Sequence, residues 1–278
     1  MNYIEIKAYA KLNLGLNIVS KRQDGYHNLN TVFYPLTELY DILEFRLSDK
    51  FMFNCDNDFI SKDNLVIKAK NILEKIIGNT LNVSIKLHKS IPIGAGLGGG
   101  SSDAAVTLIS LNELFNIGLK YEQLLDLALQ LGSDVPFFIK AKPAFAKSRG
   151  EILEMIPLDI QHPILIVNPG IHISTKDAFL NITPKENQID LKSIFSSENL
   201  DFDLISNKVT NDFENYVFEK YPEVAEIKRV MYSNKALFAL MSGSGSTVYG
   251  IFHDVIQAQS VIEKMPKNYF CSLNNPDH

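Results

Sequence analysis

The sequence predicts an α+β protein of two domains, and three observations lead to that prediction. The chain has 278 residues, enough for two hydrophobic cores. Its strand-like segments alternate apolar and polar residues, as antiparallel strands with one buried face do. In the last part of the chain the expected order is β-α-β-β-α-β with an insertion after the first strand, which is typical of a ferredoxin-like domain. We expect the boundary between residues 1–157 and 158–278.

Composition argues against several classes of partner. The net charge is -5, and no basic block accompanies aromatic residues, so a nucleic-acid partner is not expected. No apolar run approaches ~20 residues and no signal peptide opens the chain, so no membrane association is expected. Cys55 and Cys271 have neither disulfide nor metal spacing, which predicts a cytoplasmic location. The six histidines are scattered without ligand spacing, and no metal site is predicted.

The first expected element is a long strand over Ile4–Val19. Its period of two places Lys11 and Asn13 on the same face, about 7 Å apart. A polar loop follows, in which Asp24 and Gly25 signal a turn and Tyr26 stands beside His27. From the residues alone, Lys11 is either a solvated strand lysine or a functional group, and Tyr26 either covers the edge of the core or binds a ligand. Further elements are expected as strands at 31–34, 41–47 and 81–87 and helices at 63–77 and 121–131.

A glycine-rich loop is the central motif of the chain. It reads Pro92, Ile93, Gly94, Ala95, Gly96, Leu97, Gly98, Gly99, Gly100, Ser101, Ser102. Glycines cannot build a core, but a loop without Cβ atoms can bring its N–H groups close to an anion. Ser101 and Ser102 are N-cap types, and apolar residues at helical spacing follow as far as Phe115. A glycine loop that leads into a helix predicts a phosphate site.

The class of phosphate loop stays open on these residues. Gly94, Gly96 and Gly99 fit the dinucleotide-binding pattern, but that pattern directly follows the first strand of a βαβ unit. Here Pro92 separates the loop from a strand with antiparallel alternation. The loop is not a Walker A motif either, because no Gly-Lys-Ser/Thr follows the glycines.

Two further features have both a structural and a functional interpretation. Asp134 lies between the helix that Gly132 ends and an expected buried strand at 135–139, so it is either a helix cap or a fixed functional carboxylate. The turn Ser242–Ser246 is either a simple hairpin or a place where backbone approaches a ligand. The remaining elements are expected as strands at 164–167, 236–240, 247–252 and 269–272 and helices at 221–232 and 255–265.

Three motifs together resemble the GHMP kinase superfamily: Ala10–Leu16, Pro92–Ser102 and Met241–Thr247. Their order and spacing also agree, from Tyr3 to about Phe252. Within this superfamily, Lys11-Leu-Asn-Leu, Asp24-Gly-Tyr-His27 and Leu131–Pro136 are similar to the family of kinases that phosphorylate 4-diphosphocytidyl-2-C-methyl-D-erythritol. Tyr9 and Ser148 depart from that family, which often has proline and glycine there.

The resemblance implies a function and a fold. The activity would be ATP-dependent phosphorylation of the 2-hydroxyl of 4-diphosphocytidyl-2-C-methyl-D-erythritol in the non-mevalonate isoprenoid pathway. The first half would be a ribosomal S5 domain 2-like ATP- and phosphate-binding domain, and the ferredoxin-like half would lie on the substrate side. ATP and Mg²⁺ would be cofactors, with the ligands of Mg²⁺ not assigned.

The resemblance also implies roles for single residues. Asp134 would face the substrate hydroxyl, and Lys11 would pair with it as the second catalytic residue. The triphosphate would bind along Pro92–Ser102. The other implied contacts are Asn64 and Leu65 for adenine, and Asn13, Tyr26, His27 and Phe179 for the cytidyl substrate, with Tyr26 and Phe179 on either side of the cytosine and His27 at its edge.

Three alternatives remain open on the sequence. A kinase of the same superfamily could phosphorylate homoserine, mevalonate or a sugar, although Tyr26 and His27 fit a base better. A non-catalytic nucleotide-binding protein could share the fold, although it would not need both Lys11 and Asp134. A nicotinamide oxidoreductase could use the glycine loop.

Overall fold

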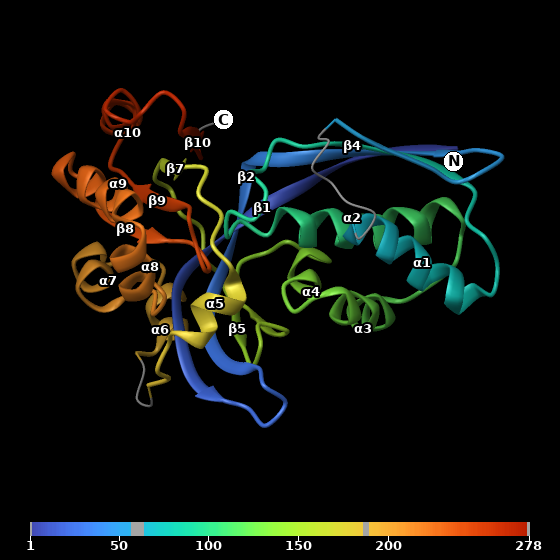
Figure 1. Ribbon diagram of the computed structural model, residues 1–278, viewed down its shortest axis with the longest axis horizontal. Coiled ribbons are helices and arrows are strands. Elements are labelled where there is room, and N and C mark those ends of the chain that lie inside the picture. The colour runs from blue at the N-terminus through green and yellow to red at the C-terminus, as the bar shows by residue number, and fades with distance from the viewer. Residues whose placement is uncertain (1, 57–63, 186–188, 277–278) are drawn as a thin grey trace. The chain divides into compact units, whose positions relative to one another are not determined.

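The computed structural model describes residues 2–56, 64–185 and 189–276 (Figure 1). This chain divides into two compact units that interleave along the sequence. The first contains Met1–Ala10, Leu39–Ile93 and Gly98–Ala141, and the second contains Lys11–Glu38, Gly94–Leu97 and Lys142–His278. Two long strands, β1 (Tyr3–Lys21) and β2 (His27–Leu47), contribute to both units. The functional division at residue 157 stays a prediction.

The first unit packs helices on a small sheet. Strand β4 (Val83–His88) pairs antiparallel with the end of β2 and parallel with β3 (Met52–Cys55). Alternate residues of β4 are buried, as expected for a strand with one face on a core. The helices α1 (Leu65–Ile77), α2 (Gly99–Leu114), α3 (Tyr121–Leu131) and α4 (Val135–Phe138) lie on one side of these strands (Figure 1). Helices α1 and α2 pack against each other, and the side chain of Leu65, the first residue of α1, lies beside Gly100 of the glycine loop.

Three expectations for β2 and for the helices of the first unit need correction. The segments 31–34 and 41–47 are not separate strands but parts of β2. Helix α2 begins at Gly99, before the expected Ser101, because Gly98 takes the N-cap position with a left-handed φ of 73°. Residues 135–138 form helix α4 and not a strand. Pro136 favours that outcome, since proline suits the first helical turn, where its missing N–H needs no partner. Asp63 lies outside the described residues, and α1 begins after Asn64.

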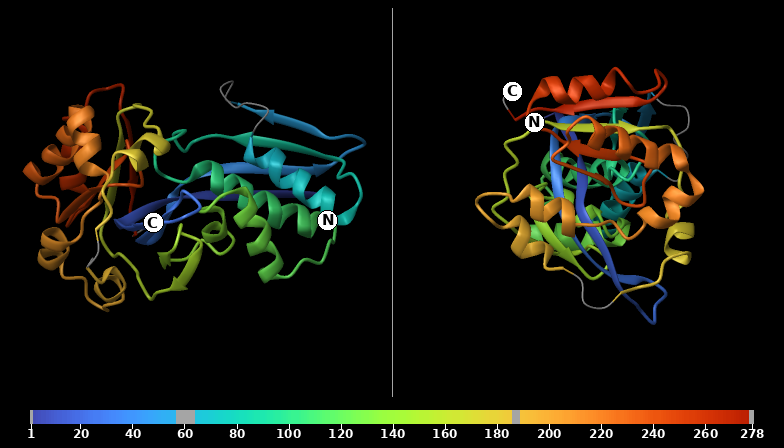
Figure 2. Two further views of the ribbon diagram at one scale, coloured as in Figure 1. Left: turned by 60° about the horizontal axis from the view of Figure 1, so that its bottom comes forward. Right: turned by 90° about the vertical axis from the view of Figure 1, so that its left-hand side faces the viewer.

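The second unit contains the ferredoxin-like sheet that the sequence predicts. Its order is β10-β7-β9-β8, and every neighbouring pair is antiparallel. The strands are β7 (Ile164–Asn168), β8 (Phe238–Met241), β9 (Val248–Ile251) and β10 (Phe270–Asn274). Helices α9 (Pro222–Ser233) and α10 (Val255–Ile262) lie against one face of this sheet (Figure 2). The insertion after β7 forms α5 (Thr175–Leu180), α6 (Leu191–Phe195), α7 (Phe202–Lys208) and α8 (Glu214–Lys220).

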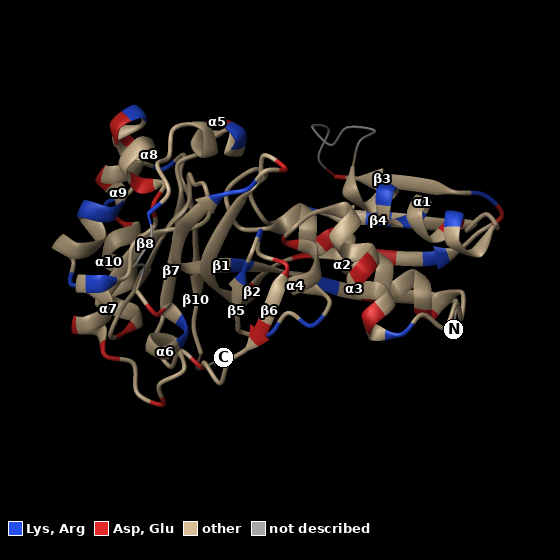
Figure 3. Ribbon diagram, turned by 90° about the horizontal axis from the view of Figure 1, so that it is seen from below, with Lys and Arg blue, Asp and Glu red and all other residues tan. Residues whose placement is uncertain are grey.

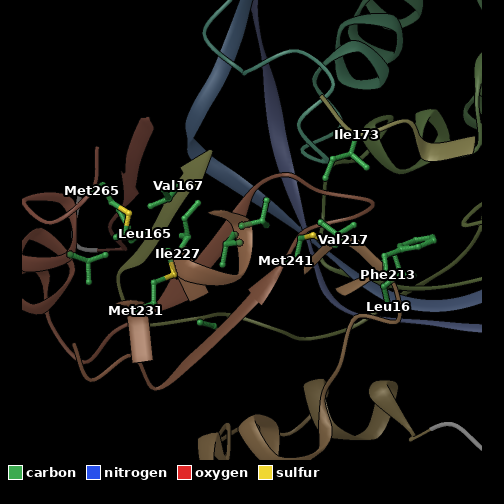
Figure 4. Close-up of a cluster of buried hydrophobic side chains, with 14 of the residues drawn as sticks. Leu16, Leu165, Val167, Ile173, Phe213, Val217, Ile227, Met231, Met241 and Met265 are labelled. Atoms are coloured by element: carbon green, nitrogen blue, oxygen red, sulfur yellow. The ribbon is translucent and has the colours of Figure 1, made fainter. Parts of the chain in front are cut away.

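A buried apolar cluster joins the sheet, its helices and β1 within the second unit (Figure 4). Leu165 and Val167 of β7 pack in it with Ile227 and Met231 of α9. At its other end Figure 4 shows Leu16 and Phe213 side by side. The start of β2 also pairs with β5 (Ala144–Lys147), which pairs with β6 (Ile152–Met155). These two short strands have too few residues for a recognisable alternation, and the sequence did not predict them.

The surface of each unit carries charges of both signs. Lys and Arg as well as Asp and Glu occur in both units (Figure 3). In the part of the chain that the structure describes, no helix is long and apolar enough to cross a membrane.

Candidate active site

The buried lysine of β1 is held by two oxygen atoms of the second unit. Lys11 is 3% exposed, and its Nζ donates to Asn13 Oδ1 and, over 3.1 Å, to Gly96 O. The ring of Phe33 lies 5.3 Å from Nζ, where a cation is attracted to the aromatic face. An ammonium group with two fixed acceptors keeps a defined position. The interpretation of Lys11 as a solvated strand lysine is therefore wrong.

A relay of hydrogen bonds fixes the orientation of the Asn13 amide. Thr31 Oγ1 donates its only proton to Gly15 O over 2.6 Å. It can therefore only accept from Asn13, and Nδ2 of Asn13 donates to it over 2.9 Å. With Nδ2 on that side, Oδ1 points to Lys11. All the atoms in this relay are buried, so the side-chain direction is set before any ligand binds.

The first half of the glycine loop packs backbone against backbone on the third motif. Gly96 has φ of 79°, and a Cβ atom at this residue would lie 2.1 Å from Ser242 O. No side chain fits there, so glycine is required for both its conformation and its space. Ser242 Oγ donates to Gly96 O over 3.0 Å and accepts from Asn13 N over 3.2 Å. The turn Ser242–Ser246 is thus more than a hairpin connection, because it binds the glycine loop and β1.

The second half of the loop belongs to the first unit and starts α2. Gly98 O accepts from Ser102 N over 2.9 Å, so Ser101 and Ser102 lie in the first helical turn. The free N–H groups of that turn, together with the helix dipole, favour an anion. A Cβ atom at Gly100 would lie 3.9 Å from the side chain of Leu65. Asn64 caps α1 by accepting from Val66 N over 2.8 Å. The two residues predicted for adenine thus lie at the start of α1, and Leu65 is beside the loop.

A buried ion triad lies beneath this half of the loop. Lys89 Nζ donates to Asp41 Oδ2 and, over 2.9 Å, to Asp103 Oδ2. Asp41 Oδ1 accepts the N–H groups of Ser90 and Ile91, which lead into the loop, over 2.6 and 2.9 Å. Because Asp103 belongs to α2, the triad connects the entrance of the glycine loop with the helix that leaves it.

The triad holds two carboxylates and one ammonium group away from water. Asp41 is fully buried and Asp103 is 3% exposed. Burial raises the pKa of Asp103 to about 7 despite the neighbouring Lys89 charge. Burial alone would lower the pKa of Lys89, but the charges of Asp103 and Asp41 outweigh it and the pKa is raised. Among the described residues, Asp103 Oδ1 meets no hydrogen-bond donor, in agreement with a carboxyl group that binds a proton easily.

Asp134 lies at the position before α4 and does not act as its cap. Its backbone is helical, and its side chain makes no capping hydrogen bond to the helix. Val135 N donates instead to Gly132 O over 3.2 Å. Capping, one of the two interpretations of Asp134, is therefore not what the carboxylate does. It belongs to the first unit, as does the start of α2.

The residues predicted for the cytosine lie in the second unit, and two of them stack. The rings of His27 and Phe179 are 5.0 Å apart and nearly parallel, at 18°. Burial and the charge of Lys21 lower the pKa of His27, which favours a neutral imidazole. Tyr26 is 52% exposed, and the guanidinium of Arg149 lies 4.6 Å from its ring.

Ser148, one of the two departures from the family pattern, occupies a backbone conformation that suits glycine. Its φ is 63°, in the left-handed region. The hydroxyl accepts from Arg22 Nη1 over 2.9 Å and donates to Glu151 Oε1 over 3.0 Å. Ser148 O also accepts from Leu29 N over 2.7 Å. These hydrogen bonds offset the strain of the left-handed backbone at Ser148 and hold the segment around Ser148 in place beside Tyr26.

Family models match both halves of the chain. The GHMP kinases N terminal domain matches residues 64–142, and the GHMP kinases C terminal domain matches residues 194–271. The chain is 45% identical to the 4-diphosphocytidyl-2-C-methyl-D-erythritol kinase of Azobacteroides pseudotrichonymphae over 251 residues, covering 87% of this chain and 91% of the relative. It is 40% identical to the kinase of the same name from Chlorobium phaeobacteroides, covering 99% of this chain and 98% of the relative.

The chain belongs to the 4-diphosphocytidyl-2-C-methyl-D-erythritol kinase family.

Solved structures agree with this membership of the 4-diphosphocytidyl-2-C-methyl-D-erythritol kinase family. A crystal structure of 4-(cytidine 5'-diphospho)-2C-methyl-D-erythritol kinase matches with a TM-score of 0.82 and 30% identity, covering 97% of this chain and 98% of that one. A homoserine kinase from Cytophaga hutchinsonii has the same fold, with a TM-score of 0.77 at 17% identity. Both the superfamily and the fold that the motifs predicted are thereby confirmed, and the nicotinamide oxidoreductase is ruled out.

Two groups of residues that hold the motifs in place were not predicted from the sequence. One is the triad of Asp41, Lys89 and Asp103. The other is the segment Asn211–Glu214, whose side chains bind the third motif. A signal for the first was Lys89, three residues before Pro92 at the start of the loop, since lysine is seldom buried unless it is paired. For the second, the sequence contains no comparable signal.

Proposed function

We propose that the protein transfers the γ-phosphoryl group of ATP to the 2-hydroxyl of 4-diphosphocytidyl-2-C-methyl-D-erythritol, a step of the non-mevalonate isoprenoid pathway. The observation that carries the proposal is the 40% identity to a kinase of that name over nearly the whole length of both chains. The buried, fixed Lys11 supports it, because a catalytic site needs charges whose positions are set in advance. We also propose a cytoplasmic location, in line with the two free thiols.

Lys11 and Asp134 would have different roles in the transfer. Asp134 would orient the 2-hydroxyl and accept its proton while the oxygen attacks the γ-phosphorus and the bond to the β-phosphate breaks. Lys11 would pair with Asp134 and stabilise charge on the transferred group. The two acceptors that hold Lys11 in a fixed position support this assignment.

The nucleotide would bind along the glycine loop. Pro92–Ser102 would surround the triphosphate, with the first turn of α2 facing the phosphates. Asn64 and Leu65 would line the adenine pocket, and the position of Leu65 beside Gly100 supports that. Mg²⁺ would enter with ATP, because kinase sites hold it mainly through phosphate oxygens with one or two carboxylates. It would neutralise charge on the phosphates.

The cytidyl substrate would bind in the second unit. Tyr26 and Phe179 would contact the two faces of cytosine, and a neutral His27 could read its edge through a ring nitrogen. In the described structure His27 lies on Phe179, so the base would have to displace or extend this stack. Asn13 would hold the substrate through the second hydrogen of its amide nitrogen.

An assay of ADP release against several acceptor alcohols tests the proposal. We expect ADP with 4-diphosphocytidyl-2-C-methyl-D-erythritol and background rates with homoserine, mevalonate or galactose. Equal or faster ADP release with one of the other alcohols would mean that this alcohol is the acceptor and would contradict the proposal. Release with none of them, from folded protein that binds ATP, would support the non-catalytic alternative.

A further inference from the structure

The segment Asn211–Glu214, which belongs to none of the three motifs, forms hydrogen bonds with the third motif. The segment Asn211–Glu214 runs beside β1, where Leu16 N donates to Thr210 O and Asp212 N donates to Leu16 O, both over 2.9 Å. Asp212 Oδ2 accepts from Ile18 N over 2.7 Å. The ring of Phe213 packs in the apolar cluster next to Leu16 (Figure 4). The segment therefore has a fixed position relative to β1.

Asn211 uses its whole amide to hold the turn of the third motif. It is 3% exposed, and Nδ2 donates to Met241 O over 2.7 Å and to Gly243 O over 2.8 Å. Oδ1 accepts from Phe213 N over 3.0 Å. An aspartate of the same size has no N–H to donate and would place an oxygen against two carbonyl oxygens. Asparagine at this position is thus needed for its two donors.

The turn that Asn211 holds lies directly against the groups that fix Lys11. A Cβ atom at Gly243 would lie 3.2 Å from Gly96 O and 3.4 Å from Asn13 Oδ1. These two oxygens are the acceptors of the Lys11 ammonium group. Ser242 Oγ, between them, bonds to Gly96 O and to Asn13 N. A shift of the turn would move both acceptors of Lys11.

We propose that Asn211 is a positioning residue for phosphoryl transfer, acting on Lys11 through the Ser242–Gly243 turn. The proposal rests on the catalytic role given to Lys11 above. The hydrogen bonds of the Asn211 side chain go to Met241 O, Gly243 O and Phe213 N, and not to Lys11 or its two acceptors. Its effect reaches Lys11 through the Ser242–Gly243 turn and the two acceptors of Lys11, Gly96 O and Asn13 Oδ1.

The test is a double-mutant cycle between Asn211→Asp and Lys11→Met, measured by single-turnover phosphorylation. In otherwise unchanged protein, Asn211→Asp should lower the rate of transfer by roughly 10- to 100-fold, the scale for a displacement of about 1 Å at a reacting group. In the Lys11→Met background it should cost less than about twofold, because residues that act as a unit are not additive.

Two further variants keep the test decisive. Asn207→Asp, the same change on an exposed face of α7, should leave the rate unchanged. If Asn211→Asp does not fold, Asn211→Ala replaces it in the cycle, because it removes the two donors to Met241 O and Gly243 O without placing an oxygen against them. Melting temperature and ATP affinity are measured for each variant.

The outcomes separate this inference from the proposed function. An equal loss of rate in both backgrounds would mean a general structural role and would overturn the inference, as would a normal rate in folded Asn211→Asp. If Lys11→Met alone retained the full rate, the proposed function of Lys11 would fail first. Loss of rate only where Lys11 is present would support the inference.

Discussion

Gly96→Ala should show how far the contact between the glycine loop and the Ser242–Ser246 turn sets the geometry around Lys11. The new Cβ atom would lie 2.1 Å from Ser242 O, whereas real Cβ contacts stay beyond 3.0 Å. The glycine loop and the Ser242–Ser246 turn would therefore have to move apart by about 1 Å, a displacement large enough to affect a reacting group. The left-handed φ of 79° adds a conformational cost of ~1–2 kcal/mol. Because Gly96 O is an acceptor of Lys11, we expect kcat to fall by roughly 10²-fold.

Gly118→Ala is the matched control for this prediction. Gly118 has nearly the same φ, 80°, but a Cβ atom there would meet nothing within 4 Å. Both variants should lose the ~1–2 kcal/mol cost of the left-handed conformation, while only Gly96→Ala should lose further stability through the contact with Ser242 O and also lose turnover. The assay is steady-state kinetics with thermal unfolding of both proteins. Equal turnover in the two variants would refute the reasoning that the contact with Ser242 sets the geometry of the site.

Three further predictions concern the catalytic pair, the base pocket and the triad. Asp134→Asn should fold and bind ATP but lose roughly 10²–10⁴ in turnover, and adding Lys11→Met should cost much less than the product of the single losses, as rapid-quench kinetics would measure. Tyr26→Ala and Phe179→Ala should each weaken cytidyl substrate binding by about 1–3 kcal/mol with ATP binding unchanged, which calorimetric titration checks; equal losses for both ligands would mean structural damage. The pKa of Asp103 is raised from 3.8 to about 7. Protonation of Asp103 therefore stabilises the folded state, and this contribution to the free energy of unfolding is fully present below pH 4 and is lost as the pH rises through 7. Asp103→Asn should remove that pH dependence, which urea unfolding at several pH values would test, and an unchanged profile would contradict the raised pKa.

The residues on β1 show what a strand pattern predicts and what it leaves out. Period two placed Lys11 and Asn13 on one face correctly, since side-chain direction follows from the backbone alone. The pattern also implied that this face meets water, but both residues are buried. Burial depends on what covers the strand, and Gly96 and Ser242 come from distant parts of the chain.

The errors at helix starts have a similar origin. Serine is a common N-cap, which favoured Ser101, but the chain turns at Gly98 and α2 starts within the glycines. Residues 135–138 are apolar enough for a buried strand, and a run of four does not separate a strand from a short buried helix. In both cases the local pattern allowed two structures, and tertiary contacts selected one.

The groups that sequence reasoning missed depend on contacts between distant segments. Asp41, Lys89 and Asp103 come from a strand, a loop and a helix, and only the fold brings their charges together. Asn211 has no spacing relation to Met241 or Gly243, the residues whose carbonyl oxygens it binds. The motifs, in contrast, could be recognised because each is a continuous segment with its own residue pattern, although the contacts between them form only in the fold.

The most direct measurement of the central claim is the identity of the product. The protein is incubated with ATP and 4-diphosphocytidyl-2-C-methyl-D-erythritol, and phosphorus NMR locates the new phosphate. We predict one phosphomonoester, on the 2-hydroxyl, formed with one ADP per product and strongly reduced in Lys11→Met and Asp134→Asn. A phosphate on another hydroxyl, or a product formed equally well by both variants, would contradict the account.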